Sequence, residues 1–291
     1  MVSAAVPSAW RARRIVAAGV TVAAYETGSE ASDARAVLLL HGLGHWTDAA
    51  WGRLVAELDP ALRYAAFDLP GFGASDKPGV RYDRAYFRRI VDDVVSALGL
   101  DRFALAGHSL GGFIAADWAG ANPERVSHLA LIAPAAFART PHHVLYALLA
   151  HAAARRLSII SPPKRFVARM LHRAVLDPSS IDEAHLERAY ELAQDLAVRR
   201  AFAGVYASAI EAFAGTHSLR AHFARYTGPV FCAWGKHDRY IPVSSLREVC
   251  RVYPHATTLV LQNSGHLPMI EDARAVGEAL REFMVSSKSS Q

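Results

Sequence analysis

Gly107-His108-Ser109-Leu110-Gly111 is the stretch that decides how this 291-residue chain is expected to fold. An uninterrupted apolar run at residues 103–106 precedes it and a helical pattern at residues 110–121 follows it, so the motif stands at a turn between a buried strand and a helix. The pattern Gly-x-Ser-x-Gly alone arises by chance in about one chain of this size in ten, and only its strand–turn–helix context makes it specific. A serine on such a sharp turn projects its hydroxyl, and the flanking glycines tolerate a strained backbone.

Short apolar runs alternate with helical patterns on both sides of this turn. The runs expected to form strands lie at residues 19–25, 36–40, 64–67, 103–106, 129–133, 230–234 and 258–261. Helical patterns between them lie at residues 49–58, 84–98 and 110–121. Strands that alternate with helices form βαβ units, so we expect an α/β fold with a mainly parallel sheet flanked by helices on both faces.

The alternation stops between about residues 134 and 228, where the sequence is helix-like throughout. Proline pairs and Asp-Pro steps divide this stretch, because proline disfavours helix in the residue before it. The helical patterns within it lie at residues 144–157, 166–175 and 182–213. We therefore expect one α/β core, made of residues 1–134 and 229–291, with residues 135–228 inserted as a helical cap.

Composition excludes several classes of protein. Hydrophobic residues make up 52% of the chain and charged residues 20%, which excludes disorder. Cys232 and Cys250 stand apart, without the spacing of a disulfide framework or a thiolate zinc site. No apolar run reaches the roughly 18 residues of a membrane-spanning helix. Arg13-Arg14 could be read as a twin-arginine export signal, but residues 19–25 fit a strand of the mature fold better, so a cytoplasmic location is expected.

Ser109 needs a base and an acid to become a nucleophile, and in this setting the acid precedes the histidine along the chain. Asp238 follows the strand at residues 230–234, and His266 follows the next strand. All three residues stand just beyond the carboxyl ends of strands, which meet at one edge of a parallel sheet. His237 is too close to Asp238 in sequence to bridge it to Ser109, and His128 starts a strand. Ser109, Asp238 and His266 are therefore the expected catalytic residues.

The negative charge that develops on an attacked ester carbonyl requires backbone donors. One expected donor is the N–H of Leu110, directly after the serine. The second is expected from the glycine-containing loop at residues 41–44, where Leu43 is the preferred candidate and Gly44 the alternative. His41 is expected to brace this loop by hydrogen bonds.

These motifs resemble those of the α/β-hydrolase fold superfamily. The resemblance rests on His41-Gly-Leu-Gly44, Asp68-Leu-Pro-Gly-Phe-Gly-Ala-Ser-Asp76, Gly107-His-Ser-Leu-Gly-Gly112, Trp234-Gly-Lys-His-Asp238 and Ser264-Gly-His-Leu-Pro268. Together they cover the chain outside the helical stretch. The resemblance implies a sheet of the eight-stranded type, a serine–histidine–aspartate triad and a cap over the pocket; the mechanism requires no metal or organic cofactor.

Differences from individual branches of the superfamily narrow the function. Haloalkane dehalogenases and epoxide hydrolases carry an aspartate where this chain has Ser109, and proline iminopeptidases have a Gly-Gly-Pro-Gly-like loop that residues 41–44 lack. A serine hydrolase that cleaves an ester or lactone through an acyl-enzyme on Ser109 fits the residues best. A carbon–carbon bond hydrolase of dienone ring-cleavage products stays open, as do non-hydrolytic binding and cofactor-free chemistry with oxygen or peroxide.

The expected substrate is a small to medium apolar molecule. The residues proposed to contact it are Gly42, His108, Phe137, Tyr146 and Leu267, although the aromatic residues of the helical stretch are also consistent with helix packing. Neither the oligomeric state nor the natural substrate follows from the sequence.

The net charge of +5 lies in the helical stretch, since residues 135–225 contain 12 Lys and Arg against 7 Asp and Glu. Residues 139–173 hold seven of these basic residues and no acid. Either this is a solvated outer face of amphipathic helices, or it attracts an anionic substrate, an acidic partner or an anionic membrane. No recognition motif supports binding of nucleic acid.

Overall fold

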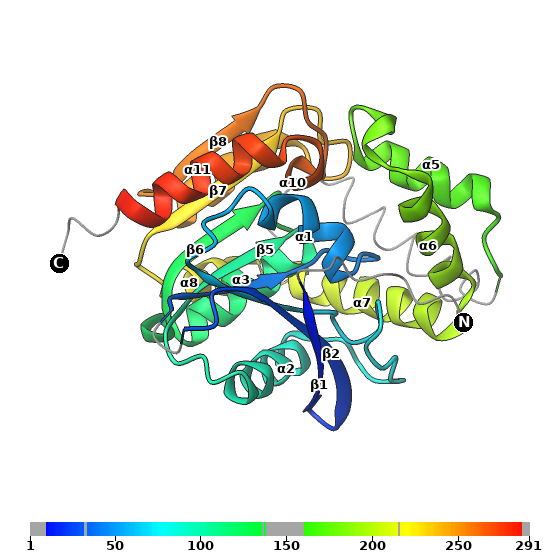
Figure 1. Cartoon of the computed structure of the whole chain (residues 1–291), viewed down its shortest axis with the longest axis horizontal. Helices are drawn as coiled ribbons and strands as arrows, with labels where there is room; N and C mark the ends of the chain where they lie inside the picture. Colours follow the sequence, from blue (N-terminus) through cyan, green and yellow to red (C-terminus); the bar gives the residue numbers. More distant parts are fainter. Residues whose placement is uncertain (1–9, 32–33, 136, 138–159, 215, 287–291) are drawn as a thin grey trace.

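A computed structural model describes residues 10–31, 34–135, 137, 160–214 and 216–286 (Figure 1). In this part of the chain eight strands form one sheet in the order β1-β2-β4-β3-β5-β6-β7-β8. The strands are β1 (Arg11–Ala17), β2 (Val20–Gly28), β3 (Ala36–Leu40), β4 (Arg63–Phe67), β5 (Phe103–His108), β6 (Val126–Ile132), β7 (Val230–Gly235) and β8 (Thr257–Leu261). The pairs β1–β2 and β2–β4 are antiparallel and all the others are parallel, which confirms the predicted mainly parallel α/β sheet.

Helices cover both faces of the sheet, so central strands such as β3 and β5 are buried along their whole length. One face packs against α2 (Arg84–Ala97), α3 (Leu110–Ala121), α8 (Thr216–Phe223) and α9 (Leu246–Val252). The other packs against α1 (Thr47–Val55), α10 (Pro268–Glu271) and α11 (Ala273–Ser286). Short 3-10 turns, η1 (Pro123–Arg125) and η3 (Val243–Ser245), precede β6 and α9.

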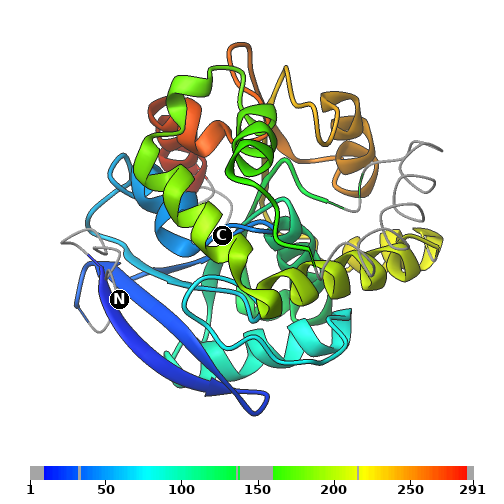
Figure 2. The same cartoon turned by 90° about the vertical axis from the view of Figure 1, so that its right-hand side faces the viewer.

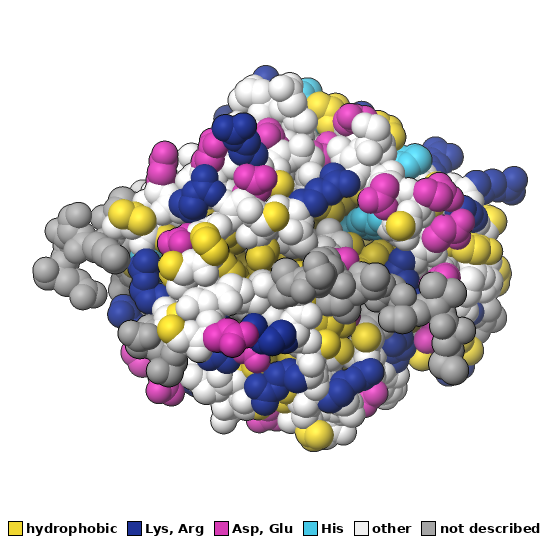
Figure 3. Space-filling model, viewed as in Figure 1, with side chains coloured by type: hydrophobic (Ala, Val, Ile, Leu, Met, Phe, Trp, Pro, Cys, Tyr) yellow, Lys and Arg dark blue, Asp and Glu magenta, His cyan; other side chains and the backbone are white. Residues whose placement is uncertain are grey.

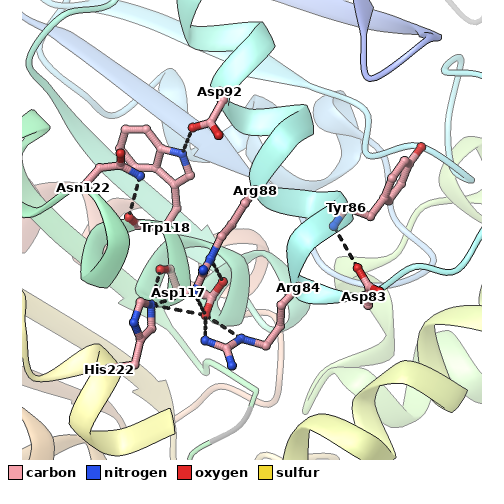
Figure 4. Close-up of polar contacts among 9 residues, drawn as sticks. All are labelled: Asp83, Arg84, Tyr86, Arg88, Asp92, Asp117, Trp118, Asn122 and His222. Atoms are coloured by element: carbon pink, nitrogen blue, oxygen red, sulfur yellow. Dashed lines mark hydrogen bonds and ion pairs between the residues drawn. The ribbon is translucent and has the colours of Figure 1, made fainter. Parts of the chain in front are cut away.

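A buried carboxylate joins three of the helices on the first face. Asp117 of α3 has a side chain only 3% exposed, and Arg84 and Arg88 of α2 both bind it (Figure 4). Arg88 places Nε 2.6 Å from one carboxylate oxygen and Nη2 3.0 Å from the other, the two-point contact that suits a guanidinium. His222 of α8 lies 2.8 Å from the backbone oxygen of Asp117. This cluster fixes α2 and α8 against α3.

The chain between β6 and β7 is helical where the structure describes it (Figure 2). It contains α5 (Lys164–Ala174), the short turn η2 (Pro178–Ser180), α6 (Glu183–Gln194) and α7 (Leu196–Ala214), and ends with α8. The expected helix at residues 144–157 lies outside the described residues. The stretch expected as one long helical segment at 182–213 is two helices, because Asp195 adopts extended backbone angles and its carboxylate caps the next helix by accepting from the N–H of Ala197 at 2.8 Å.

The sequence analysis missed β1. Its first four residues are exposed and include three arginines, so it lacks the apolar alternation by which strands are recognised. It pairs with β2 through a two-residue turn at Ala18-Gly19, where both residues have positive φ, the geometry favoured in tight hairpins. Arg13 and Arg14 therefore belong to a paired strand of the fold. In the described residues no helix has the length and apolar character needed to cross a membrane.

Helix α6 packs against the loop that follows β3. The ring of His185 in α6 lies 5.0 Å from that of Trp46 and 5.7 Å from that of His45, measured between ring centroids. Burial lowers the pKa of His185 from about 6.5 to about 4, a shift that the carboxylate of Asp182 opposes and the guanidinium of Arg53 supports. The imidazole of His185 is therefore neutral in the folded protein at pH 7.

We expect Asp117→Asn to lower the free energy of unfolding by about 2 kcal/mol, because it leaves two neighbouring guanidinium groups without their shared carboxylate. Urea denaturation measures this change. The matched control is Asp92→Asn on the exposed side of α2, where an amide oxygen can still accept the hydrogen bond from Trp118 and the cost should be below about 1 kcal/mol. Equal costs for the two variants would contradict the structural role given to Asp117.

His185 should make the protein less stable in mild acid. Its pKa is lower in the folded state than in the unfolded chain, so the unfolded chain binds a proton first as the pH falls below about 6.5, and stability is lost between about pH 6.5 and pH 4. The loss from this residue between pH 7 and pH 5 is at most about 2 kcal/mol. Urea titrations at the two pH values should show a smaller difference for His185→Phe than for the wild type, and an equal difference would contradict the effect assigned to this buried imidazole.

Candidate active site

The turn between β5 and α3 holds Ser109 in a strained backbone conformation, with φ of 52° and ψ of −112°. Few residues with a side chain adopt a positive φ, and such strain collects at functional sites. Glycine is needed on the helical side of the turn, since a Cβ on Gly111 would lie 2.1 Å from the carbonyl oxygen of Leu40. On the strand side, a Cβ on Gly107 would lie 2.2 Å from the carbonyl oxygen of Gly111. The two glycines of the motif therefore allow β5, α3 and β3 to approach one another.

The structure brings together three of the side chains proposed from the sequence. His266 Nε2 lies 3.1 Å from Ser109 Oγ, and His266 Nδ1 lies 2.7 Å from Asp238 Oδ2. Ser109 directly follows β5, Asp238 follows β7, and His266 follows β8, so each lies just beyond the carboxyl end of a parallel strand. With Nδ1 protonated toward Asp238, Nε2 can accept the hydrogen bond from the serine hydroxyl.

The carboxylate of Asp238 is oriented by its own loop. Its Oδ1 accepts hydrogen bonds from the N–H groups of Tyr240 and Ile241, each at 2.8 Å. The other oxygen is thereby left to the imidazole of His266. The side chain of Asp238 is fully buried in this arrangement, so its charge is directed at His266 and is little screened by water.

Two contacts of the His266 loop were not found from the sequence. The N–H of His266 donates to the carbonyl oxygen of Ala174, at the end of α5, at 2.6 Å. Glu271 in α10 accepts from the N–H of Gly265 at 2.6 Å with one oxygen and from the N–H of Leu176 at 2.5 Å with the other. The bonds of Ala174 to His266 and of Leu176 to Glu271 join residues more than 90 positions apart, and no local sequence pattern signals them. They tie the end of α5 to the histidine loop.

The loop after β3 lies against the serine. A Cβ on Gly42 would come within 3.2 Å of the Cβ of Ser109 and 2.6 Å of Nδ1 of His108, so only glycine allows this approach. His41 braces the loop as expected, because its Nε2 accepts from the N–H of Leu69 at 2.8 Å and its Nδ1 lies 2.8 Å from the carbonyl oxygen of Gly42.

Leu43 and Leu110, whose N–H groups are the proposed oxyanion donors, are neighbours in sequence of residues at the serine turn. Leu43 follows Gly42 in the loop that touches Ser109, and Leu110 is the first residue of α3. Within the described part of the chain, neither N–H donates to a backbone or side-chain acceptor. Two backbone donors beside a serine hydroxyl can hold an oxyanion.

His108 contacts His266 through a hydrogen bond and through its ring. Its Nε2 donates to the carbonyl oxygen of His266 at 2.9 Å, and its buried ring lies 4.8 Å from the ring of His266, measured between centroids. Burial lowers the pKa of His108 well below its ordinary value, and the same holds for His45, so both rings are neutral at pH 7. His108 is thus a neutral neighbour that holds the histidine loop, and its proposed contact with substrate stays a prediction.

The remaining residues proposed to contact substrate lie elsewhere. Phe137 is 3% exposed and packs against Phe223 and Tyr253 in the core on the α8 side of the sheet. Leu267 is fully buried in the core on the other side of the sheet. The structure therefore places both side chains in packing positions, and Tyr146 lies outside the described residues.

The basic residues of the helical stretch are partly neutralised. Lys164 of α5 contacts Glu183 and Glu187 of α6, and Arg173 lies over the ring of Tyr240 at 5.9 Å. Figure 3 shows acidic and basic side chains interspersed over the visible face. Arg139, Arg155 and Arg156, which contribute to the basic run, lie outside the described residues.

In chemical terms the site combines a hydroxyl, an imidazole and a buried carboxylate. This set can transfer an acyl group without a metal. Among the described residues, no group of three or more His, Cys, Asp or Glu side chains is arranged to hold a metal ion.

Comparisons with known proteins agree with the fold. An uncharacterised protein of Mycobacterium tuberculosis is 26% identical over 266 residues, which cover 88% of this chain and 77% of that protein. A thermophilic esterase from Thermogutta terrifontis has a TM-score of 0.78 at 22% identity, covering 95% of this chain and 98% of that chain. The 2-hydroxy-6-oxo-6-phenylhexa-2,4-dienoate hydrolase of Rhodococcus sp. strain RHA1 also has a TM-score of 0.78, at 24% identity, covering 94% of this chain and 98% of that chain. The latter two likenesses show the fold alone.

A profile of the family described as alpha/beta hydrolase fold matches residues 35–273, which is most of the chain. The match includes the strained serine turn, the loop after β3 and the loops that carry Asp238 and His266. Together with the eight-stranded sheet, it shows that this chain belongs to the alpha/beta hydrolase fold family.

Proposed function

We propose that the protein is a serine hydrolase that cleaves an ester or lactone bond through an acyl-enzyme on Ser109. The observation that carries this proposal is the line of contacts from Ser109 Oγ to His266 and on to Asp238, at 3.1 Å and 2.7 Å, on a strained strand-to-helix turn. A serine with a base in reach, and the base oriented by an acid, is the arrangement that activates a hydroxyl.

In the proposed first step, His266 Nε2 accepts the proton of Ser109 as Oγ bonds to the substrate carbonyl carbon. Asp238 holds the imidazole by its Nδ1 and stabilises the positive charge that forms on it. The N–H groups of Leu43 and Leu110 donate to the oxyanion. His266 then gives its proton to the leaving oxygen, and an alcohol departs. Water activated by His266 releases the acid in a second cycle of the same kind.

The proposed role of residues 135–228 is that of a cap over this site. Two contacts support it: α6 lies against the loop after β3 through His185, and the end of α5 is bonded to the His266 loop. A cap that excludes water would strengthen the electrostatic interactions at Ser109. A small to medium, largely apolar substrate suits the enclosed site that such a cap would form.

A second candidate function is the cleavage of a carbon–carbon bond in a dienone. It is favoured by the likeness in fold to the dienoate hydrolase of Rhodococcus, whose match covers nearly the whole of both chains. This reaction uses the same serine turn and histidine, but it needs a further group that protonates the dienone before cleavage. The ester or lactone reaction needs only the groups described above, and we therefore place it first.

We expect Ser109→Ala to lower kcat for nitrophenyl esters by about 10⁴-fold or more, because the variant lacks the nucleophile. A fluorophosphonate probe should label the wild type at Ser109 and leave the variant unlabelled. Circular dichroism and the melting temperature establish that the variant is folded. Ester turnover that survives in the folded variant would refute the assignment of Ser109.

A substrate panel separates the two candidate reactions. We expect the wild type to hydrolyse nitrophenyl esters and lactones with a kcat/KM at least about 100-fold above that for a coloured ring-cleavage dienone, because a group for ketonisation is not part of the proposed site. Absorbance assays follow the nitrophenyl esters and the dienone, and titration of released acid follows the lactones. The reverse order of kcat/KM would make the carbon–carbon bond hydrolase the better description.

A further inference from the structure

A small cavity lies between α2, α3 and α7. Its volume is about 40 Å³, which is room for about three water-sized groups. Most of its wall is apolar and includes Phe87, Phe113 and Val205. Two polar side chains, Arg84 and Ser208, also reach the wall.

Residues next to Ser109 line the cavity. Leu110, which follows the serine and supplies a proposed oxyanion donor, lines it. So does Ala135, whose N–H donates to the carbonyl oxygen of Ser109 at 2.9 Å. In the binding mode proposed below, a short chain on the carbonyl carbon attacked by Ser109 extends past Leu110 and Ala135 into this space.

Arg84 is held in place at the cavity by a buried partner. Its Nε lies 2.7 Å and its Nη2 2.5 Å from Oδ1 of Asp117, so Nη1 takes no part in this ion pair. The side chain of Arg84 is 32% exposed, whereas that of Asp117 is 3% exposed. A guanidinium fixed on one side and accessible on the other is preorganised to bind a second carboxylate.

Positive charge exceeds negative charge at this end of α2. Arg84 and Arg88 share the single carboxylate of Asp117. Burial lowers the pKa of His222, so this neighbour adds no positive charge at pH 7. Asp92 is bound to the indole of Trp118, on the opposite side of the cluster from Arg84 (Figure 4). Among the described residues, Asp83 is paired with Arg81, so Arg84 and Arg88 still share one carboxylate beside a largely apolar cavity.

We propose that the substrate is a half-ester of a short dicarboxylic acid, whose free carboxylate enters this cavity and binds Arg84. The proposal rests on hydrolysis at Ser109 as proposed above. It assigns to Arg84 the role of a specificity-determining residue, which contacts the far end of the acyl chain. A carboxylate has three heavy atoms, so it fills the cavity, and a long acyl chain does not fit.

The test compares monoethyl glutarate with ethyl pentanoate, which has the same acyl-chain length and no charge. We expect the ratio of kcat/KM for the charged ester to that for the neutral ester to fall about tenfold or more in Arg84→Gln, because a charge-assisted hydrogen bond is lost. Arg84→Lys should recover part of the ratio. Arg88→Gln is the matched control, since Arg88 binds the same Asp117 from the same helix but does not line the cavity, and its ratio should stay within about threefold of the wild type.

Two results would overturn the proposal: an unchanged ratio in Arg84→Gln, or an equal fall in Arg84→Gln and Arg88→Gln, which would mean that only the ion-pair cluster matters. Melting temperatures establish that each variant is folded. Calorimetric binding of monoethyl glutarate to the Ser109→Ala protein, with and without Arg84→Gln, gives a readout that needs no turnover. If the wild type hydrolyses neither ester, the proposed function fails, and tenfold weaker binding on loss of Arg84 still decides whether the carboxylate site exists.

Discussion

The strained turn at Ser109 is the constraint on which the rest of the site depends. A positive φ at a residue with a side chain costs about 1–3 kcal/mol and persists only where the surroundings enforce it. Here the enforcement comes from close backbone contacts: α3 starts directly after β5, and Gly111 touches the carbonyl oxygen of Leu40 in β3. The same contacts bring the loop after β3 within reach of the serine hydroxyl. The geometry of the proposed nucleophile and that of the loop with a proposed backbone donor therefore come from one local packing arrangement.

Much of this arrangement follows from local sequence patterns. Buried parallel strands such as residues 36–40 are uninterrupted apolar runs, so the fold could be predicted. The Gly-x-Ser-x-Gly motif marks the turn, so the set of Ser109, Asp238 and His266 could be predicted as well. The limits are equally local. The strand β1 carries charged residues because it is an exposed edge, and its first four residues have no alternation of buried and exposed positions to detect. The break at Asp195 depends on a cap inside a helical run.

Other features depend on contacts between distant residues, which no local pattern encodes. Phe137 and Leu267 are apolar residues near functional segments, and the sequence alone does not distinguish a pocket wall from a core position; the structure buries both. The bonds from Glu271 to Gly265 and Leu176 join segments that only the fold brings together. Arg84 looks like an ordinary surface residue of an amphipathic helix until Asp117 and the cavity are placed beside it.

The bond between Ala174 and His266 links the position of α5 to the position of the proposed base. The N–H of His266 donates to the carbonyl oxygen of Ala174, the last residue of α5, and the N–H of Leu176 donates to Glu271. A displacement of this end of α5 would therefore also displace the loop that carries the imidazole. The α5 end of the proposed cap is therefore hydrogen-bonded into the loop of the proposed base, and the two would have to move together.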